Sequence, residues 1–338
     1  MPFCAHRCTY CSFVALEGRS EENEYFDALE REIRTGTDFH LSAAASAAAA
    51  YKQNSRFPIL DSVYFGGGTP SYVDASRLGR VLGTLEEIFG MSSNCEITAE
   101  ANPDDLSLDK VGFLRDAGIN RISVGVQSLV DAELEPLERR HDAAQAVRAV
   151  REAVAAFGNV SADLMIGIPG QTRESLRSSL DGLLSAGVSH LSVYLLEMDK
   201  APRLVALKKA RPELFADDDE TADRWLEVDE RLESAGLPRY ELSNWAKRGS
   251  ESRHNLKYWT LVPVLGFGVA AHSFDGERRW ANTGMLAEYL KRTAAGASPA
   301  ATFEETEGSD FLRRKEGLML GLRLSGGVPS SSFEEIRK

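Results

Sequence analysis

The sequence lacks a hydrophobic run long enough to cross a membrane, and it lacks the basic-then-apolar start of a signal peptide. The longest apolar stretch, residues 261–271, is far shorter than the ~20 residues that a membrane helix needs. Basic residues are in deficit, because 39 Lys and Arg stand against 51 Asp and Glu, giving a net charge of −12. Phosphate binding depends on clustered Lys and Arg, so nucleic acid is a disfavoured partner. We expect a water-soluble, cytoplasmic protein with no membrane span.

Cysteine is scarce and unevenly distributed. Four cysteines in 338 residues are too few for a secreted disulfide scaffold. Cys4, Cys8 and Cys11 fall within eight residues, whereas Cys95 stands alone. Such clustering in an intracellular chain predicts metal or redox chemistry rather than disulfides. We expect Cys95 to be a small buried hydrophobe.

Short β-rich segments alternate with helical patterns through the first two thirds of the chain. Each predicted strand is brief, rich in apolar or β-branched residues, and bounded by Gly, Pro, Asn or Asp. These strands are expected at residues 62–65, 96–99, 121–126, 161–166 and 190–195. Amphipathic helical periods lie between them, for example at Leu78, Val81, Leu82, Leu85 and Ile88. Strand starts recur about every 30 residues, which predicts repeated βα units and a parallel sheet, either a barrel or a doubly wound sheet.

The pattern changes between residues 212 and 240. An acidic start at residues 217–220 precedes an amphipathic helix, which a Gly-Leu-Pro stop signal ends near residue 238. The chain that follows is more aromatic and irregular. We therefore expect a first domain at residues 1–215 and a smaller mixed domain at residues 216–338. The low-complexity stretch at residues 42–50 is expected to be a helical or flexible surface excursion.

The cysteine cluster has the spacing C-x3-C-x2-C. Thiolates are soft ligands that suit zinc or iron–sulfur clusters. A loop of this length can bind three corners of a cubane cluster and leave the fourth iron without a protein ligand. Two other interpretations stay open from the spacing alone: a zinc site with His6 as fourth ligand, and chance spacing of buried thiols.

Polar residues recur where the predicted strands end. The first such place is the turn at residues 65–71, Phe-Gly-Gly-Gly-Thr-Pro-Ser, where glycine lets a ligand approach the backbone. The next strand ends lie near Glu100, Gln127 and Asp163. In a (β/α) barrel the C-terminal strand ends form the active-site rim. One such residue could be a helix cap, but four in succession predict one shared pocket.

Together these motifs resemble the radical S-adenosylmethionine (SAM) superfamily, and in particular its HemN/HemW branch. The cysteine spacing is similar to the cluster motif of the superfamily, and residues 65–71 are similar to the glycine motif that holds the amino group of SAM. The resemblance covers nearly the whole chain. The coproporphyrinogen III oxidases of this branch carry a further Cys where this chain has Phe13. The string from His254 to Trp259, H-N-x-x-Y-W, is instead similar to the HemW-type haem chaperones and is associated with haem.

This resemblance implies a partial (β/α) barrel followed by a smaller mixed C-terminal domain. It assigns Cys4, Cys8 and Cys11 to a 4Fe–4S cluster. It implies SAM contacts at Tyr10, Gly67, Gly68, Thr69, Glu100, Gln127, Arg139 and Asp163, with His272 a further candidate. A carboxylate can pair with the ammonium or ribose hydroxyls of SAM, and a guanidinium can pair with its carboxylate.

The resemblance also implies haem at the H-N-x-x-Y-W string. There His254 can ligate iron, and Tyr258 and Trp259 can form a flat apolar wall. The alternative, which we weight equally, is a buried His254 that bonds a backbone carbonyl.

Three functions follow from these observations. The first is a haem chaperone that passes haem to respiratory haem proteins, with the cluster and SAM supporting the transfer. The second is a radical SAM oxidoreductase acting on a porphyrinogen, in which a radical derived from SAM takes hydrogen from the substrate. The third is a zinc-stabilised binding module. Phe13 and the H-N-x-x-Y-W string favour the chaperone.

The two ends of the chain differ from the family pattern. In the family a strand leads into the first cysteine ligand, whereas here only Met1, Pro2 and Phe3 precede Cys4. We therefore expect that the natural chain begins earlier. Residues 334–338 have the pattern of an interrupted helix.

Overall fold

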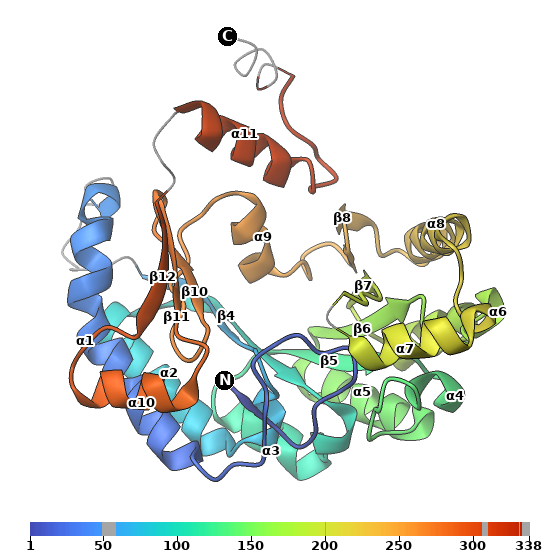
Figure 1. Cartoon of the computed structure of the whole chain (residues 1–338), viewed down its shortest axis with the longest axis horizontal. Coiled ribbons are helices and arrows are strands. Elements are labelled where there is room, and N and C mark those ends of the chain that lie inside the picture. Colours follow the sequence, from blue (N-terminus) through green and yellow to red (C-terminus); the bar gives the residue numbers. More distant parts are fainter. Residues whose placement is uncertain (49–58, 200, 306–309, 331, 333–338) are drawn as a thin grey trace.

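A curved seven-stranded sheet forms the centre of the computed structural model, which describes residues 1–48, 59–199, 201–305, 310–330 and 332 (Figure 1). Its strand order is β3-β4-β5-β6-β7-β9-β8. The first five strands are parallel: β3 (Leu60–Phe65), β4 (Met91–Ala101), β5 (Arg121–Gln127), β6 (Val160–Ile166) and β7 (His190–Leu195). A short hairpin of β8 (Arg239–Glu241) and β9 (Asn244–Ala246) joins β7 in antiparallel orientation.

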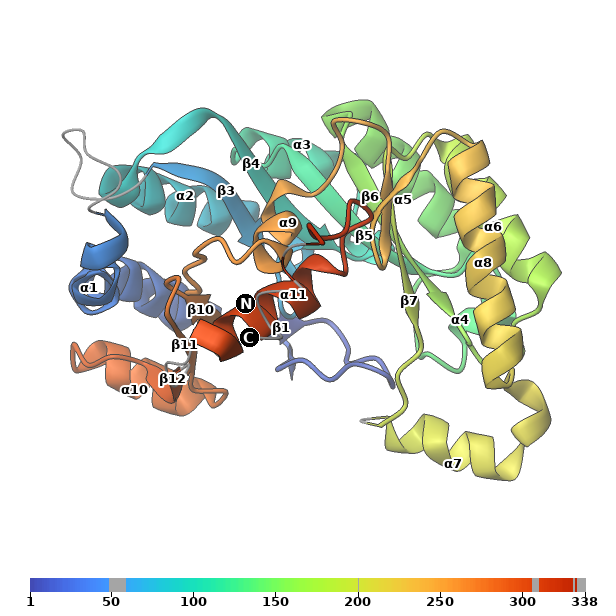
Figure 2. The same cartoon turned by 90° about the horizontal axis from the view of Figure 1, so that it is seen from above.

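Helices cover the convex side of this sheet (Figure 2). They are α2 (Ala75–Phe89), α3 (Leu108–Asp116), α5 (Ala143–Phe157), α6 (Arg173–Ala186) and α8 (Asp218–Ser234), with the shorter α4 (Asp131–Leu134) and α7 (Pro202–Ala210) at one end. Local sequence sets their ends. Asp74 caps α2 by accepting a hydrogen bond from the Ser76 N–H, and Gly187 ends α6 in a left-handed conformation with φ of 92°.

The five parallel strands and the helices between them confirm the predicted α/β organisation. The predicted apolar face of α2 is buried at Leu78, Val81, Leu82 and Leu85. One strand differs, because β4 begins at Met91 rather than near Glu96. The added residues include a polar Ser-Ser-Asn stretch, of which Ser93 and Asn94 are exposed, so no apolar signal marked them as a strand.

A second, antiparallel sheet contains β10 (His272–Phe274), β11 (Arg278–Asn282) and β12 (Ala300–Glu305). The helix α10 (Leu286–Ala294) lies between β11 and β12 in the chain and packs against α1 (Glu22–Ala48). A buried carboxylate ties these parts together. Glu32 of α1 accepts hydrogen bonds from the Tyr289 hydroxyl at 2.6 Å and the Gly268 N–H at 2.8 Å. Burial raises the pKa of Glu32, and these donors offset part of that effect.

Two further helices lie near the main sheet. The helix α9 (Arg253–Trp259) packs against β3, and α11 (Asp310–Gly321) packs against α9. The main sheet continues past residue 215 through β8 and β9, so the division at residue 215 stays a prediction.

Of the low-complexity stretch, residues 42–48 are helical as part of α1, and residues 49 and 50 lie outside the described residues, as do residues 334–338. Within the described part of the chain, no helix is both long and apolar enough for a membrane span.

Candidate cofactor site

The three clustered cysteines lie on one loop at the C-terminal edge of the sheet. The loop runs between two short parallel strands, β1 (Phe3–Cys4) and β2 (Leu16–Glu17). The Cys11 N–H donates to the Cys8 carbonyl at 3.1 Å, which forms a turn between these two cysteines. The backbone N–H of Thr69 donates to the Phe3 carbonyl at 2.8 Å. This bond fixes the loop to the glycine turn that follows β3.

Side-chain hydrogen bonds connect the cysteine loop to the ends of two strands and to Arg139, which follows α4. The Cys4 sulfur lies 3.2 Å from the Thr69 hydroxyl. Asn102, just after β4, donates to the Thr69 hydroxyl at 3.1 Å and accepts from the Arg139 guanidinium at 2.7 Å. Arg139 also lies 3.4 Å from both the Cys8 sulfur and the Tyr10 hydroxyl. The chain therefore places a cation and two hydroxyl groups around the thiols.

The chemistry of this donor set fits an anionic iron–sulfur cluster. All three loop cysteines are free, and Cys8 and Cys11 are partly accessible. Burial raises the pKa of the Cys4 and Cys11 thiols, and the neighbouring cysteines raise these values further. Burial opposes the charge on Arg139, but Tyr10 and Cys8 raise the pKa of the guanidinium, so it stays cationic. A cation in this position offsets part of the charge of the thiolates.

A zinc site fits the same residues less well. His6, the expected fourth ligand, instead lies 3.2 Å from Glu17 and 3.4 Å from Glu138.

A buried carboxylate forms the second part of the site. Glu100, near the end of β4, accepts a hydrogen bond from the Gly67 N–H at 3.2 Å and another from the Tyr64 hydroxyl at 2.9 Å. Burial raises the pKa of Glu100 to about 7, and Asp163 contributes to the rise. A Cβ on Gly66 would lie 3.1 Å from the Glu100 carboxylate, so a side chain there would crowd this carboxylate.

The predicted SAM residues lie on neighbouring strands, but Asp163 is in the middle of β6 and not at its end as predicted. Asp163 on β6 accepts from Ser123 on β5 at 3.2 Å, and burial raises its pKa. Gln127 ends β5 with φ of 68°, a left-handed conformation that is uncommon for a residue with a side chain. A Cβ on Gly125 would lie 3.1 Å from the Gln127 amide and 3.5 Å from Arg139. Gln127 therefore adjoins the cysteine end of the site.

Gly68 continues the glycine turn, where an added Cβ would meet the Phe3 backbone at 2.6 Å. His272 lies on β10 in the second sheet with its side chain exposed. The SAM roles of these residues stay predictions. Cys95 is buried in β4, as expected, and burial raises the pKa of its thiol to about 11.

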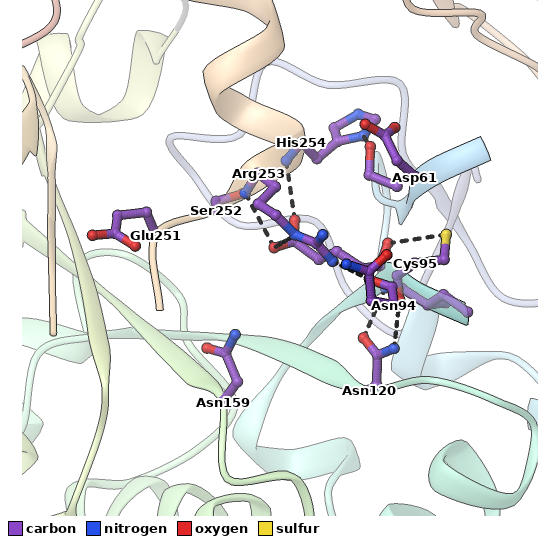
Figure 3. Close-up of polar contacts among 12 residues, drawn as sticks. Asp61, Asn94, Cys95, Asn120, Asn159, Glu251, Ser252, Arg253 and His254 are labelled. Atoms are coloured by element: carbon purple, nitrogen blue, oxygen red, sulfur yellow. Dashed lines mark hydrogen bonds and ion pairs between the residues drawn. The ribbon is translucent and has the colours of Figure 1, made fainter. Parts of the chain in front are cut away.

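The H-N-x-x-Y-W string forms α9, and Glu96 holds the start of this helix. The carboxylate of Glu96 accepts from the backbone N–H groups of Arg253 at 3.1 Å and His254 at 3.0 Å. Figure 3 shows the Arg253 side chain directed toward Asn94 of β4, whereas the His254 ring lies beside Asp61. The Arg253 guanidinium also bonds the Asn94 carbonyl. Two distant segments are therefore joined at a buried carboxylate.

The His254 ring contacts side chains rather than a backbone carbonyl. Its Nδ1 lies 3.0 Å from the Ser62 hydroxyl and its Nε2 lies 3.0 Å from the Tyr258 hydroxyl. The ring stacks on Tyr64, with ring centres 5.3 Å apart and an angle of 26°. Burial lowers the pKa of His254 to about 4, so the ring is neutral. The expectation of a backbone partner is wrong, because β3 places a serine hydroxyl there.

Several residues of the site were not singled out from the sequence. Asn102 was part of a polar strand end, so a signal existed, but its link from Thr69 to Arg139 depends on the fold. Tyr64 and Ser62 lie inside a predicted strand, where nothing local distinguishes them from packing residues. Glu96 acts on a helix that lies 157 positions later in the sequence.

Comparison with known proteins agrees with this geometry. The model of the radical SAM superfamily matches residues 1–183, which include the cysteine loop, the glycine turn and the strands from β3 to β6. The heme chaperone HemW of Bacillus subtilis is 35% identical, over 99% of this chain and 85% of the relative. HemW of Mycobacterium tuberculosis strain H37Rv is 36% identical, over 97% of this chain and 81% of the relative. The chain belongs to the HemW family of radical SAM proteins.

The fold also has a solved counterpart. Coproporphyrinogen III oxidase (HemN) from Escherichia coli superposes with a TM-score of 0.80, covering 99% of this chain and 76% of the oxidase at 22% identity. This similarity confirms that the chain folds as a partial barrel followed by a mixed C-terminal region. A bovine mitochondrial relative, radical S-adenosyl methionine domain-containing protein 1, is 32% identical over 98% of this chain and 69% of its own length.

The superfamily uses a 4Fe–4S cluster together with SAM. Such a cluster, when bound, supplies one-electron chemistry and an iron with a free coordination position. The residues present fit this group: Cys4, Cys8 and Cys11 are the candidate ligands, and Arg139 neutralises charge beside them. Glu100 offers a carboxylate to a cation at the glycine turn.

Proposed function

We propose that this chain is a haem chaperone that holds a 4Fe–4S cluster, SAM and haem, and delivers haem to respiratory haem proteins in the cytoplasm. The observation that carries the proposal is the similarity over nearly the whole chain to relatives named heme chaperone HemW. Phe13 supports it further, since the coproporphyrinogen III oxidases of the branch carry a further Cys at this position of the cluster loop.

In this proposal Cys4, Cys8 and Cys11 bind the cluster. SAM lies against the glycine turn, with its ammonium on Glu100 and its carboxylate on Arg139. Haem binds at α9, which holds the H-N-x-x-Y-W string. Tyr64 supports this arrangement because it contacts both regions: its hydroxyl donates to Glu100 and its ring stacks on His254.

Anaerobic reconstitution tests the proposal. The purified chain should contain about four irons and show cluster absorbance. It should then form a stable complex with haem and transfer that haem to an apo haem protein. A parallel incubation with coproporphyrinogen III, SAM and a reductant should give no decarboxylated product. Decarboxylation without stable haem binding would favour the oxidoreductase, and a colourless zinc-loaded protein would favour the zinc module.

A further inference from the structure

The geometry points to Tyr258, rather than His254, as the residue that binds haem iron, with His254 acting as its hydrogen-bond partner. This inference rests on the proposed haem-binding function. It concerns which atom binds the iron, and it replaces His254, the ligand that the sequence suggested, with Tyr258. Three observations carry it: the exposure of the two side chains, the contacts that surround the imidazole, and the chemistry of the pair.

The two residues differ in accessibility. They lie one turn apart on α9, so their side chains share one face of the helix. His254 is 8% exposed, whereas Tyr258 is 47% exposed. The Tyr258 hydroxyl lies 3.0 Å from His254 Nε2, the ring nitrogen that faces away from β3. A planar ligand that arrives from solvent therefore meets the Tyr258 side chain before it can reach the imidazole.

The surroundings of His254 hold it in place. Ser62 bonds Nδ1, Tyr64 stacks against one face, and Glu96 binds the backbone N–H of the residue. Direct iron binding by Nε2 would require Tyr258 to leave and the buried ring to move out of these contacts. Iron binding by Tyr258 leaves all of them in place. A ligand held by preformed contacts binds with a smaller ordering cost.

The chemistry of the pair is suited to ferric haem. Tyrosine is an established class of axial ligand for haem iron. The proton transfer uses the tautomer in which Tyr258 O–H donates to His254 Nε2 and Nδ1–H donates to Ser62, one of the two that these contacts allow. When the iron–oxygen bond forms, the Tyr258 O–H bond breaks and its proton passes to Nε2.

The Nδ1 proton then leaves through the bonded Ser62 hydroxyl to solvent, so the ring carries one proton before and after the step. The serine hydroxyl then donates to Nδ1, since a hydroxyl can both donate and accept. Overall, one proton is released to water and the oxidation state of the iron does not change. If the haem iron carried a water molecule, that water is displaced.

Apolar surface lies beside this residue. The helix α11 contacts α9, and the Arg323 guanidinium lies over the Trp259 ring at 4.2 Å. Close to this contact, Met319 is 62% exposed and Leu322 is 54% exposed. A porphyrin needs such a surface for its faces and edges.

The test uses the full chain, titrated with ferric haem and followed by absorption, resonance Raman and EPR spectroscopy. Wild-type protein should show the phenolate-to-iron charge transfer of a tyrosine-ligated ferric haem. Tyr258→Phe should lose this signature and bind haem about tenfold more weakly or worse, because an iron–ligand bond is lost. His254→Gln should keep the signature at shifted energy, with affinity a few-fold weaker. Reduction to ferrous haem should weaken binding, because a hard anionic oxygen favours ferric iron.

A matched control exists in the same chain. The buried His190 bonds the Tyr240 hydroxyl at 2.8 Å, and Tyr240→Phe should leave the haem spectrum and affinity unchanged. A wild-type spectrum retained in Tyr258→Phe, or lost in His254→Gln alone, would overturn the inference while leaving haem binding intact. Absence of haem binding by the wild-type chain would overturn the proposed function and this inference with it. Far-UV circular dichroism of each variant reports whether the fold is kept.

Discussion

Replacing Glu96 with alanine should release the start of α9 while leaving the cysteine loop in place. Glu96 is 4% exposed, and its two carboxylate oxygens accept the backbone N–H groups of Arg253 at 3.1 Å and His254 at 3.0 Å. Its Oε2 also lies 3.7 Å from Nε of Arg253. Because the first N–H groups of a helix have no partner within it, removal of this acceptor leaves them unpaired.

The size of the effect follows from these bonds. An unpaired buried donor costs about 1–3 kcal/mol, and water can replace part of the loss at the less buried Arg253 N–H. We therefore expect α9 to open more easily by about 2–4 kcal/mol. This corresponds to roughly 30- to 700-fold faster amide hydrogen exchange, since every 1.4 kcal/mol is a factor of ten. Glu96→Gln should fall between wild type and Glu96→Ala, because the amide retains one oxygen acceptor.

Hydrogen exchange followed by mass spectrometry measures this directly in peptides that cover α9, with peptides from α5 as an internal reference. Glu251→Ala is the matched control. Glu251 lies on the loop just before α9, and its carboxylate accepts only the exposed Gly249 N–H at 2.8 Å in the described contacts, so its loss should cost less than about 0.5 kcal/mol. Haem affinity should fall in Glu96→Ala while cluster absorbance stays. Equal exchange in the two alanine variants would refute the capping role of Glu96.

Three further predictions concern the cofactors. Changing any loop cysteine, for example Cys8→Ala, should abolish cluster absorbance, whereas Cys95→Ala should retain it; a cluster lost in Cys95→Ala would contradict the assignment. SAM binding, measured by calorimetry, should tighten as pH rises through about 7, because the pKa of Glu100 is raised to that value and only its ionised form attracts an ammonium. Glu100→Gln should bind SAM more weakly and lose this pH dependence, and an unchanged profile would exclude Glu100. Saturating SAM should change haem affinity in wild type but not in Tyr64→Phe, and equal coupling in both would refute the connection.

The sequence predicted the parallel strands and their polar ends because both depend on local patterns. Apolar segments at βα spacing correspond to β3 through β7, and the strand-end residues Glu100 and Gln127 lie where a parallel sheet places its C-terminal ends. The attachment of α9 could not be predicted in this way. It depends on Glu96, whose side chain lies on a strand and whose partners are 157 and 158 positions away. No periodicity connects residues at that separation.

Tyr64 gives a physical reason for a haem segment and a SAM pocket to occur in one fold. Its hydroxyl donates to Glu100 at 2.9 Å, and its ring stacks on His254. A cation bound at Glu100 favours the ionised carboxylate, and a hydrogen bond to an ionised acceptor is stronger than one to a neutral acid. The Tyr64 ring is then held more firmly beneath the imidazole. On the proposed function, SAM therefore tightens haem binding, and haem must tighten SAM binding by the same factor, because coupling between two sites is reciprocal. Phenylalanine keeps the ring but not the hydroxyl, so it removes the coupling while preserving the stack.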